Sequence, residues 1–250
     1  MIKDAIILVA GKGTRLKPLT LHTHKCLTKV NGKEILFNAL DKLAGNGIRH
    51  VTLVVGYLGD TIRAEVGSDH KGMSISYVEN DIFDITNTSY SLLLGLKDQG
   101  EYDELFVLEG DVFFSDEIFR RLTEDSHVNA TLLEPYRPDL DGTFVELNDE
   151  GFVADWTHKS MREAGYEVES KYKTINLHKF SKEFVDKVLF PDVEEICREK
   201  EGKEPLENVM RKIVREDHDA VYGVLSGGMK WYEIDDIDDL HRAESIFTEN

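Results

Sequence analysis

Residues 11–25, GKGTRLKPLTLHTHK, combine two glycines with several cationic and histidine side chains and contain no acidic residue. They directly follow residues 5–10, AIILVA, an apolar run that is typical of a buried parallel strand. Where glycines remove side chains, backbone N–H groups can approach an anion closely, and such loops commonly follow a parallel strand. The pattern therefore predicts a phosphate-binding loop, and the alternative is a basic loop that faces only solvent.

Two known phosphate-loop patterns do not fit this segment. The dinucleotide-binding fingerprint needs a third glycine three residues after Gly13, and the sequence has Leu16 there. The P-loop needs Gly-Lys-Ser/Thr after a four-residue gap, which is also absent. If the loop binds a phosphate, it therefore belongs to another class of phosphate site.

Carboxylates offer a second kind of chemistry, metal binding. Asp111 ends the apolar run 104–111, ELFVLEGD, where a strand would leave the sheet at its ligand-binding edge. A carboxylate there is costly without a cation, so we predict that Asp111 binds a metal ion. The alternative is a helix cap for the segment after Ser115. Acidic residues also crowd into 233–239, where some of them suit the N-terminus of a last helix.

The elements that must position these residues alternate in type up to residue 127. Strands are predicted at 5–9, 50–57, 74–80 and 104–111, and helices at 34–47 and 89–98. One of the residues 86–88 can cap the second helix. Such alternation indicates right-handed βαβ units and an α/β fold with a mostly parallel, Rossmann-like central sheet flanked by helices.

The pattern changes after residue 127, where strands with short turns predict a smaller, partly antiparallel region. Strands are expected at 129–136, 143–156, 172–180, 220–225 and 231–234, and helices at 181–189, 205–216 and 236–247. No internal repeat or low-complexity segment divides the chain, so we expect one continuous domain over residues 1–250.

Composition argues against several classes of protein. The net charge of −18 argues against a nucleic-acid polymer as partner, although a nucleotide needs only a local cationic pocket. No apolar run approaches the roughly 20 residues that span a bilayer, and the N-terminus does not resemble a signal peptide. Cys26 and Cys197 are too few for a disulfide framework. We therefore expect a cytoplasmic protein that has no membrane partner.

The residues GKGTRLKPLT…HKCLTKVNGKEIL, from position 11 to 36, resemble the signature of the nucleotidyltransferases that activate sugar phosphates and small phospho-alcohols, a family with a GT-A-like fold. The matching positions are Gly11, Gly13, Arg15, Leu16, Pro18, Leu19, Thr20, Lys25, Leu27, Val30 and Gly32. His24 stands where the family usually has proline. Because Lys25 is kept, this departure bears on loop rigidity rather than on the chemistry.

Further segments resemble the branch that contains phosphocholine cytidylyltransferase and 2-aminoethylphosphonate cytidylyltransferase. They are residues 54–60, 77–96, 109–114 and 231–240. The resemblance is good over the first 115 residues, loose over 130–205, and confined to one motif in the tail. It implies a nucleotide-binding half, residues 1–127, and an acceptor-binding half, residues 128–250, that carries a C-terminal metal-ligand motif.

The resemblance implies a magnesium-dependent reaction of the EC 2.7.7 type. An oxygen of a small phosphate or phosphonate, such as 2-aminoethylphosphonate or a phosphocholine-like compound, attacks the α-phosphorus of CTP, and pyrophosphate leaves. No general base is required, because the acceptor oxygen is already ionised near neutral pH. The protein instead holds two anions in line and neutralises their charge.

The same resemblance implies roles for individual residues. Arg15 would clamp the β- and γ-phosphates as a planar bidentate donor, and Lys25 would bridge the α-phosphate and the acceptor. Asp111 and Asp235 would bind magnesium. The nucleotide would also contact Ala10, Gly11, Gly13, Thr14, Asn80 and Ser89. The acceptor would contact Tyr136, Asp141, Lys159, Lys171 and Lys173, although a solvated side chain describes any single lysine equally well.

An acceptor ammonium could be enclosed by aromatic rings through cation–π contacts. The candidates are Tyr90, Trp156, Tyr172 and Trp231, of which none is singled out, because aromatic side chains more often belong to the core. The alternatives are a sugar-1-phosphate nucleotidyltransferase that uses dTTP or UTP and a non-catalytic nucleotide-binding relative. The sequence does not decide the acceptor, the number of magnesium ions, the pathway or the oligomeric state. A homodimer is one of the oligomeric states left open.

Overall fold

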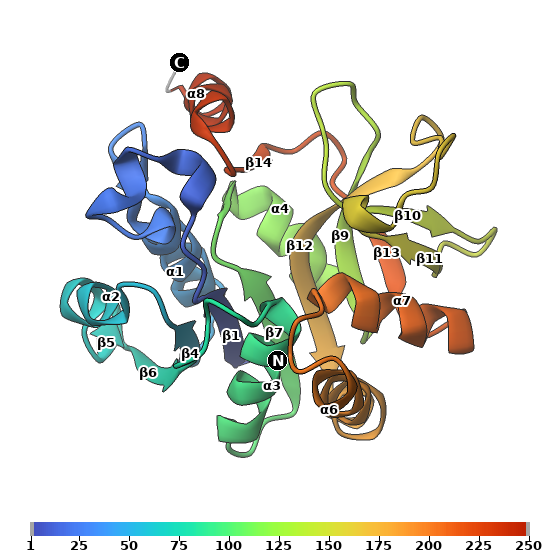
Figure 1. Cartoon of the computed structure of the whole chain (residues 1–250), viewed down its shortest axis with the longest axis horizontal. Helices are drawn as coiled ribbons and strands as arrows, with labels where there is room; N and C mark the ends of the chain where they lie inside the picture. Colours follow the sequence, from blue (N-terminus) through green and yellow to red (C-terminus); the bar gives the residue numbers. More distant parts are fainter. Residues whose placement is uncertain (1–2, 249–250) are drawn as a thin grey trace.

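The computed structural model describes residues 3–248. They form an α/β fold around one ten-stranded mixed sheet (Figure 1). The strand order is β11-β10-β12-β7-β1-β4-β6-β5, with β9 paired to β12 and β13 paired to β9. Strand β7 from the first half of the chain pairs antiparallel with β12 from the second. The sheet therefore runs through both halves of the chain without a break.

The first half of the sheet is parallel apart from its edge. Its strands are β1 (Asp4–Val9), β4 (His50–Val55), β5 (Asp69–His70), β6 (Met73–Glu79) and β7 (Glu104–Glu109), and among the pairs that these strands form with one another only β5–β6 is antiparallel. Strand β1 is central and buried on both faces: Ile7 belongs to the core on one side and Ile6 to the core on the other. This is the two-residue period of a strand, and it explains the continuous apolar run that predicted β1.

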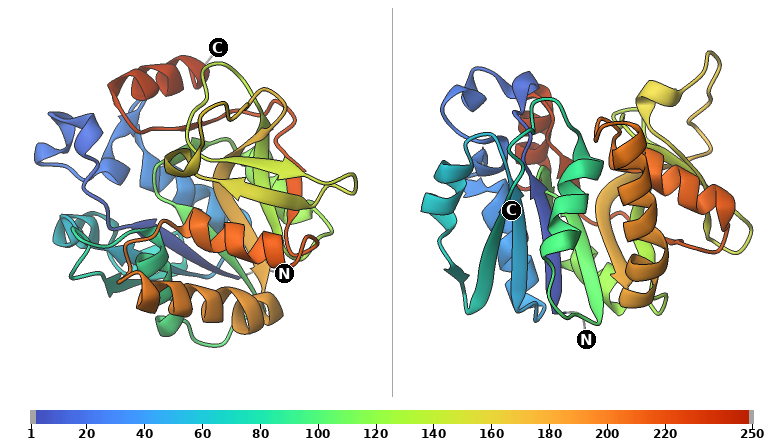
Figure 2. Two further views of the ribbon diagram at one scale, coloured as in Figure 1. Left: turned by 45° about the vertical axis from the view of Figure 1, so that its right-hand side comes forward. Right: turned by 60° about the horizontal axis from the view of Figure 1, so that its bottom comes forward.

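Helices cover both faces of the sheet, which confirms the predicted fold class. Helices α1 (Ile35–Gly45), α2 (Gly59–Val66) and α4 (Asp116–Glu124) contribute to one core cluster, and α3 (Thr88–Asp98), α6 (Phe190–Glu199) and α7 (Leu206–Glu216) contribute to the other. Figure 2 shows α3, α6 and α7 side by side on one face. Fully burying one leucine stabilises a fold by about 1.5–3 kcal/mol, so the rows of leucines on α1 and α3 hold these layers together.

The second half of the sheet is mostly antiparallel. Its strands are β9 (Ala130–Pro135), β10 (Phe144–Leu147), β11 (Val153–Thr157), β12 (Tyr172–Ser181) and β13 (Tyr222–Leu225), and only the β9–β13 pair among them is parallel. Two small ladders lie outside the main sheet. They pair β2 (Lys29–Val30) with β3 (Lys33–Glu34) and β8 (Val112–Phe114) with β14 (Trp231–Glu233), and α8 (Ile237–Ile246) follows β14.

Some helices differ from the sequence prediction. The sequence analysis misses α2 and α4, which have only 8 and 9 residues, too few for a clear helical period. The helix predicted at 181–189 continues to Glu199, through α5 (Lys182–Phe184), a π-helical segment (Val185–Leu189) and α6. Pro191 lies in the first turn of α6, directly after the π-helical segment, where a missing N–H disturbs the hydrogen bonding least.

Candidate active site

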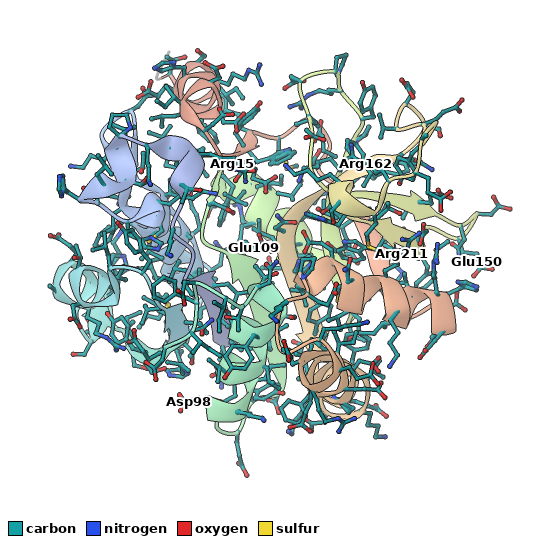
Figure 3. All side chains as sticks on the ribbon, in the orientation of Figure 1. Arg15, Asp98, Glu109, Glu150, Arg162 and Arg211 are labelled. Carbon is teal, nitrogen blue, oxygen red and sulfur yellow. The ribbon has the colours of Figure 1, made fainter. Side chains whose placement is uncertain are left out.

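A cleft of about 370 Å³ opens at the carboxyl ends of the parallel strands and is lined by residues from both halves of the chain. Ala10 and Gly11 enter it directly after β1, and Gly110 and Asp111 enter it directly after β7. Figure 3 labels Glu109, the last residue of β7, near the centre of the molecule. Open α/β sheets bind their ligands at this edge, so the cleft is the candidate active site.

Four residues with predicted catalytic roles converge in the cleft through ion pairs. The Nζ of Lys25 donates to Oδ2 of Asp111 at 2.8 Å and to Oδ1 of Asp235 at 2.7 Å. The guanidinium of Arg15 lies 2.7 Å from the same Oδ1 of Asp235. Burial alone would lower the pKa of Lys25, but the two carboxylates outweigh it and raise that pKa. The cluster therefore keeps a charged ammonium ion between two aspartates.

The ladder between β8 and β14 brings the two aspartates together. Glu233 pairs with Val112 across this ladder, and the N–H of Ile234 donates to the carbonyl of Asp111 at 2.9 Å. Because Asp235 is the residue after Ile234, this backbone contact places it close to Asp111, although 124 positions separate the two aspartates in the sequence.

Two of the other acidic residues near the C-terminus have a structural role. Asp236 and Asp239 form a capping box at the start of α8, in which each carboxylate accepts from the other residue's N–H. This confirms that part of the acidic run serves the N-terminus of the last helix.

The glycine-rich loop packs directly against Lys25. Gly13 has a φ of 56°, and a Cβ built on it would lie 2.7 Å from the Cβ of Lys25, so this position requires glycine. Among residues 3–248, no atom outside Gly11 and its two chain neighbours lies within 4 Å of a Cβ built on Gly11, which leaves the backbone open there. Ala10, Gly11, Gly13 and Thr14 all line the cleft, as a phosphate-binding loop requires.

Asn80 and Ser89, two of the residues predicted to contact the nucleotide, have different positions. Asn80 lines the cleft, but its amide donates to the hydroxyls of Thr86 and Ser91, both at 3.1 Å, and thus ties the 81–86 loop to α3. The structure does not bring Ser89 to the cleft: its buried hydroxyl donates to the carbonyl of Glu204. Ser91 lines the cleft instead, because residues two apart on a helix point to nearly opposite sides.

Of the predicted acceptor residues, Lys159 and Lys173 line the cleft. Lys173 is only 2% exposed, and its Nζ donates to Glu233 and to the carbonyl of Thr174, each at 2.7 Å. Asp141 lies in an adjoining cavity that shares both lysines, and its carboxylate pairs with Arg162 at 3.1 Å.

The structure does not bring Lys171 and Tyr136 to the cleft. Lys171 precedes β12, and its ammonium pairs with Glu146 and lies over the ring of Tyr166. The Tyr136 N–H donates to the carbonyl of Lys171, and its ring packs beside Phe144. Both residues therefore belong to the outer part of the antiparallel region.

Two cleft glutamates lie close to Asp111, and the sequence analysis assigned neither of them. Glu109, Asp111 and Glu233 each offer a carboxylate oxygen within 4.8 Å of the others. Burial, together with the neighbouring acids, raises the pKa of both Glu109 and Glu233. The other oxygen of Asp111, Oδ1, is buried and has no hydrogen-bond partner among residues 3–248. An oxygen-only donor set with an unpaired buried oxygen fits a hard cation such as magnesium.

Glu207, from the first turn of α7, is a further cleft residue that the sequence analysis missed. Its Oε1 accepts from the hydroxyl of Thr143 at 3.0 Å, and its charge is the strongest neighbouring influence that raises the pKa of Glu109. Within the described residues, neither Glu207 nor Glu109 has a lysine, arginine or histidine nitrogen within 4.0 Å. The end of the cleft near Thr143 therefore holds two carboxylates without a direct ion pair, although Lys173 lies close enough to lower the pKa of Glu109. Among the features of the sequence, only the i, i+2 spacing of Glu109 and Asp111 could have indicated part of this acidic end of the cleft.

Aromatic side chains contribute little to the cleft. None of the four candidates for an ammonium cage lines it, and the two tryptophans are core residues with exposures of 1% and 2%. Apart from histidines, Phe83 is the one aromatic residue of the described chain that lines the cleft.

Comparison with known proteins gives consistent results. A model of the nucleotidyl transferase family matches residues 4–250. The CMP-5'-(3-aminopropyl)phosphonate synthase of Streptomyces rubellomurinus is 31% identical over 98% of this chain, and the choline-phosphate cytidylyltransferase of Streptococcus pneumoniae is 32% identical over 60% of it. This chain spans only 38% and 62% of the lengths of those two proteins.

A solved structure supports the fold. The CTP:phosphocholine cytidylyltransferase from Streptococcus pneumoniae superimposes with a TM-score of 0.80 at 24% identity, covering 99% of this chain and all of the other. Among residues 3–248, no helix is long and apolar enough to cross a membrane.

Proposed function

The chain belongs to the nucleotidyl transferase family, and from that premise we propose that it is a magnesium-dependent cytidylyltransferase. It transfers CMP from CTP to a small acceptor that carries a phosphate or phosphonate at one end and a primary amine at the other. Residues 1–127 supply the nucleotide-binding half, and residues 128–250 supply the acceptor-binding half.

The cations of the cleft serve the phosphates. Arg15 and Lys25 lie where the glycine-rich loop meets the two aspartates, and Lys159 lies across the cleft in the acceptor half. An oxygen of the acceptor forms a bond to the α-phosphorus of CTP, the bond to the bridging oxygen breaks, and pyrophosphate leaves with the electron pair. Since all the reacting groups are anions, Arg15 and Lys25 act by orienting them and neutralising their charge.

Asp111 and Asp235 would hold the magnesium ion, with Glu233 next to Asp111. Magnesium would supply charge neutralisation of the triphosphate oxygens. In the described structure Lys25 and Arg15 neutralise these aspartates, so they are positioned to exchange partners when a triphosphate arrives.

The acidic end of the cleft is the observation that supports a primary amine. Within the part of the chain that the structure describes, every other acid that lines the cleft forms an ion pair, whereas Glu109 and Glu207 form none. A primary ammonium ion offers three N–H donors to carboxylates, whereas a trimethylammonium group offers none and is usually bound by aromatic faces. Because the described residues of the cleft include two carboxylates without an ion pair and no aromatic cage, we favour an aminoalkyl phosphonate or phosphate over phosphocholine.

The test is pyrophosphate release with each nucleoside triphosphate, magnesium and a panel of acceptors. The panel contains 2-aminoethylphosphonate, 3-aminopropylphosphonate, phosphoethanolamine, phosphocholine, 2-hydroxyethylphosphonate and glucose 1-phosphate. We expect turnover with CTP and the primary amines, and weak turnover or none with phosphocholine and hydroxyethylphosphonate. Turnover with the sugar phosphate alone would replace this proposal by a sugar nucleotidyltransferase.

A variant pair locates the amine within the cleft. Glu207→Gln removes one unpaired carboxylate, and we expect it to raise the KM of the aminated acceptor about tenfold or more, as for a lost hydrogen bond to a charged group. The KM of CTP should stay unchanged. Glu183→Gln, which alters an exposed carboxylate paired only with Lys187, is the control. An unchanged KM for the aminated acceptor in Glu207→Gln would contradict the amine assignment.

A further inference from the structure

His24 is a cleft residue whose hydrogen bonding is incomplete. Its side chain is 2% exposed and lines the cleft, and the Gly11 backbone lies close enough to the ring to oppose the lowering of its pKa by burial. The Nδ1 atom accepts from the N–H of Cys26 at 3.1 Å, which caps the short helix η3 (Lys25–Leu27). The Nε2 atom is buried and has no hydrogen-bond partner among residues 3–248.

The surroundings of the ring determine which nitrogen carries the proton. Nδ1 faces two donors, because the Sγ of Cys26 also lies 3.0 Å from it. Burial raises the pKa of the Cys26 thiol, so the sulfur keeps its proton and can donate. Burial likewise lowers the pKa of His24 to about 4, which keeps the imidazole neutral at physiological pH. A neutral ring whose Nδ1 accepts must carry its proton on Nε2.

A buried N–H without an acceptor is unfavourable, and few such groups persist in folded proteins. This one belongs to a ring that lines a substrate cleft, next to the loop formed by residues 10–14. We propose that His24 is a nucleotide-binding residue whose Nε2–H donates a hydrogen bond to an oxygen of the nucleoside triphosphate held by that loop. The inference rests on the proposed function only in requiring that the cleft bind a nucleotide.

The chemistry of the ring limits it to this role. Nδ1 is occupied by Cys26, and Nε2 carries the proton, so the ring cannot act as a general base. A neutral donor also adds no charge beside the ammonium of Lys25, whereas a second cation there would be repelled. Proline, which the family pattern has at this position, has no donor at all, so His24 adds a contact to this chain that the pattern lacks.

Two variants separate the two nitrogens of the ring. His24→Asn places an amide near the position of Nδ1 and can still accept from Cys26, but it cannot reach as far as Nε2. His24→Gln places an N–H near the position of Nε2. Calorimetric titration of CTP with magnesium, without acceptor, should show about tenfold weaker binding for His24→Asn and a partial recovery for His24→Gln. His218→Asn, at an exposed histidine far along the sequence, is the control and should bind as the unaltered protein does.

Nitrogen NMR of the unaltered protein gives a readout that does not depend on any variant's stability. With ¹⁵N-labelled histidine, His24 should show a protonated Nε2, and its N–H resonance should shift when CTP binds. A protonated Nδ1, or CTP binding without change at His24 and with unchanged affinity in His24→Asn, would overturn the inference and leave the proposed function intact. A protein that binds no nucleotide would overturn both.

Discussion

Replacing Lys25 by methionine tests the charge cluster at the centre of the cleft. Methionine keeps most of the apolar stem but removes the ammonium group that donates to both Asp111 and Asp235. Lys25 is 13% exposed, and breaking a buried ion pair by removing one partner typically costs about 3–5 kcal/mol. Arg15 still contacts Asp235, so we expect the lower end, about 3 kcal/mol.

That loss should appear in thermal unfolding. One kcal/mol shifts the Tm of a chain of this size by about 2–4 °C, so Lys25→Met should lower it by about 6–12 °C. The double variant Lys25→Met/Asp235→Asn should recover much of this loss, because it also removes one of the two carboxylates that lose their ammonium partner. Lys187→Met, at an exposed pair, should leave the Tm unchanged.

The pH dependence of the effect follows from the pKa shifts. The pKa of Lys25 is raised, so its contribution to stability is complete below about 10.5 and is lost only as the pH rises through the folded-state pKa. Although burial opposes it, the pKa of Asp235 is lowered by Lys25 and Arg15, so its contribution is complete above about 3.9 and is lost as the pH falls through the folded-state pKa. The difference in Tm between Lys25→Met and the unaltered protein should therefore be constant near neutral pH and shrink in acid.

Turnover provides the second readout. Lys25→Met should lose at least about a hundredfold in kcat, as when a donor to transition-state charge is removed, and the double variant should not regain it. A single variant with unchanged Tm would show that the cluster does not stabilise the fold. A single variant with unchanged turnover would show that Lys25 does not contact the reacting phosphates.

Three more predictions concern the same cleft. Asp111→Asn should abolish magnesium-dependent pyrophosphate release, and retained turnover would exclude Asp111 as a metal ligand. Arg15→Gln should raise the KM for CTP about tenfold without changing the Tm, because the guanidinium is 56% exposed; a lowered Tm would point to a structural role. The raised pKa of Glu109 means that the folded protein loses stability as the pH rises above about 4.3, so Glu109→Gln should have a higher Tm than the unaltered protein near pH 8 and an equal one near pH 4. Equal Tm values at both pH values would show that the folded structure does not raise the pKa of Glu109.

Local patterns predicted the first half of the molecule well, for physical reasons. A strand buried on both faces must be apolar throughout, which made β1, β4 and β7 visible in the sequence. The loop after β1 needs glycine at residue 13 because of its positive φ and its contact with Lys25. By contrast, α2 and α4 are short and were missed, since packing against the sheet rather than internal periodicity stabilises them.

The same limit explains why some of the predicted site residues lie outside the cleft. Ser89 and Ser91 are equally polar, and only the orientation of α3 decides which of them lines the cleft. Lys171 and Lys173 are likewise similar in the sequence. Lys171 lies just before β12 and pairs with Glu146, whereas Lys173 lies within β12 and forms a buried ion pair with Glu233.

The order of residues alone shows which chemical groups are available and that the glycine-rich loop and Asp111 each follow a buried strand, because both depend on short-range backbone geometry. Which distant groups meet depends on the packing of the whole fold. The pairing of β8 with β14 joins Asp235 to Asp111, and the packing of α7 places Glu207 beside Glu109. Such contacts depend on strand pairing and helix docking across more than ninety residues, which no local period of the sequence encodes.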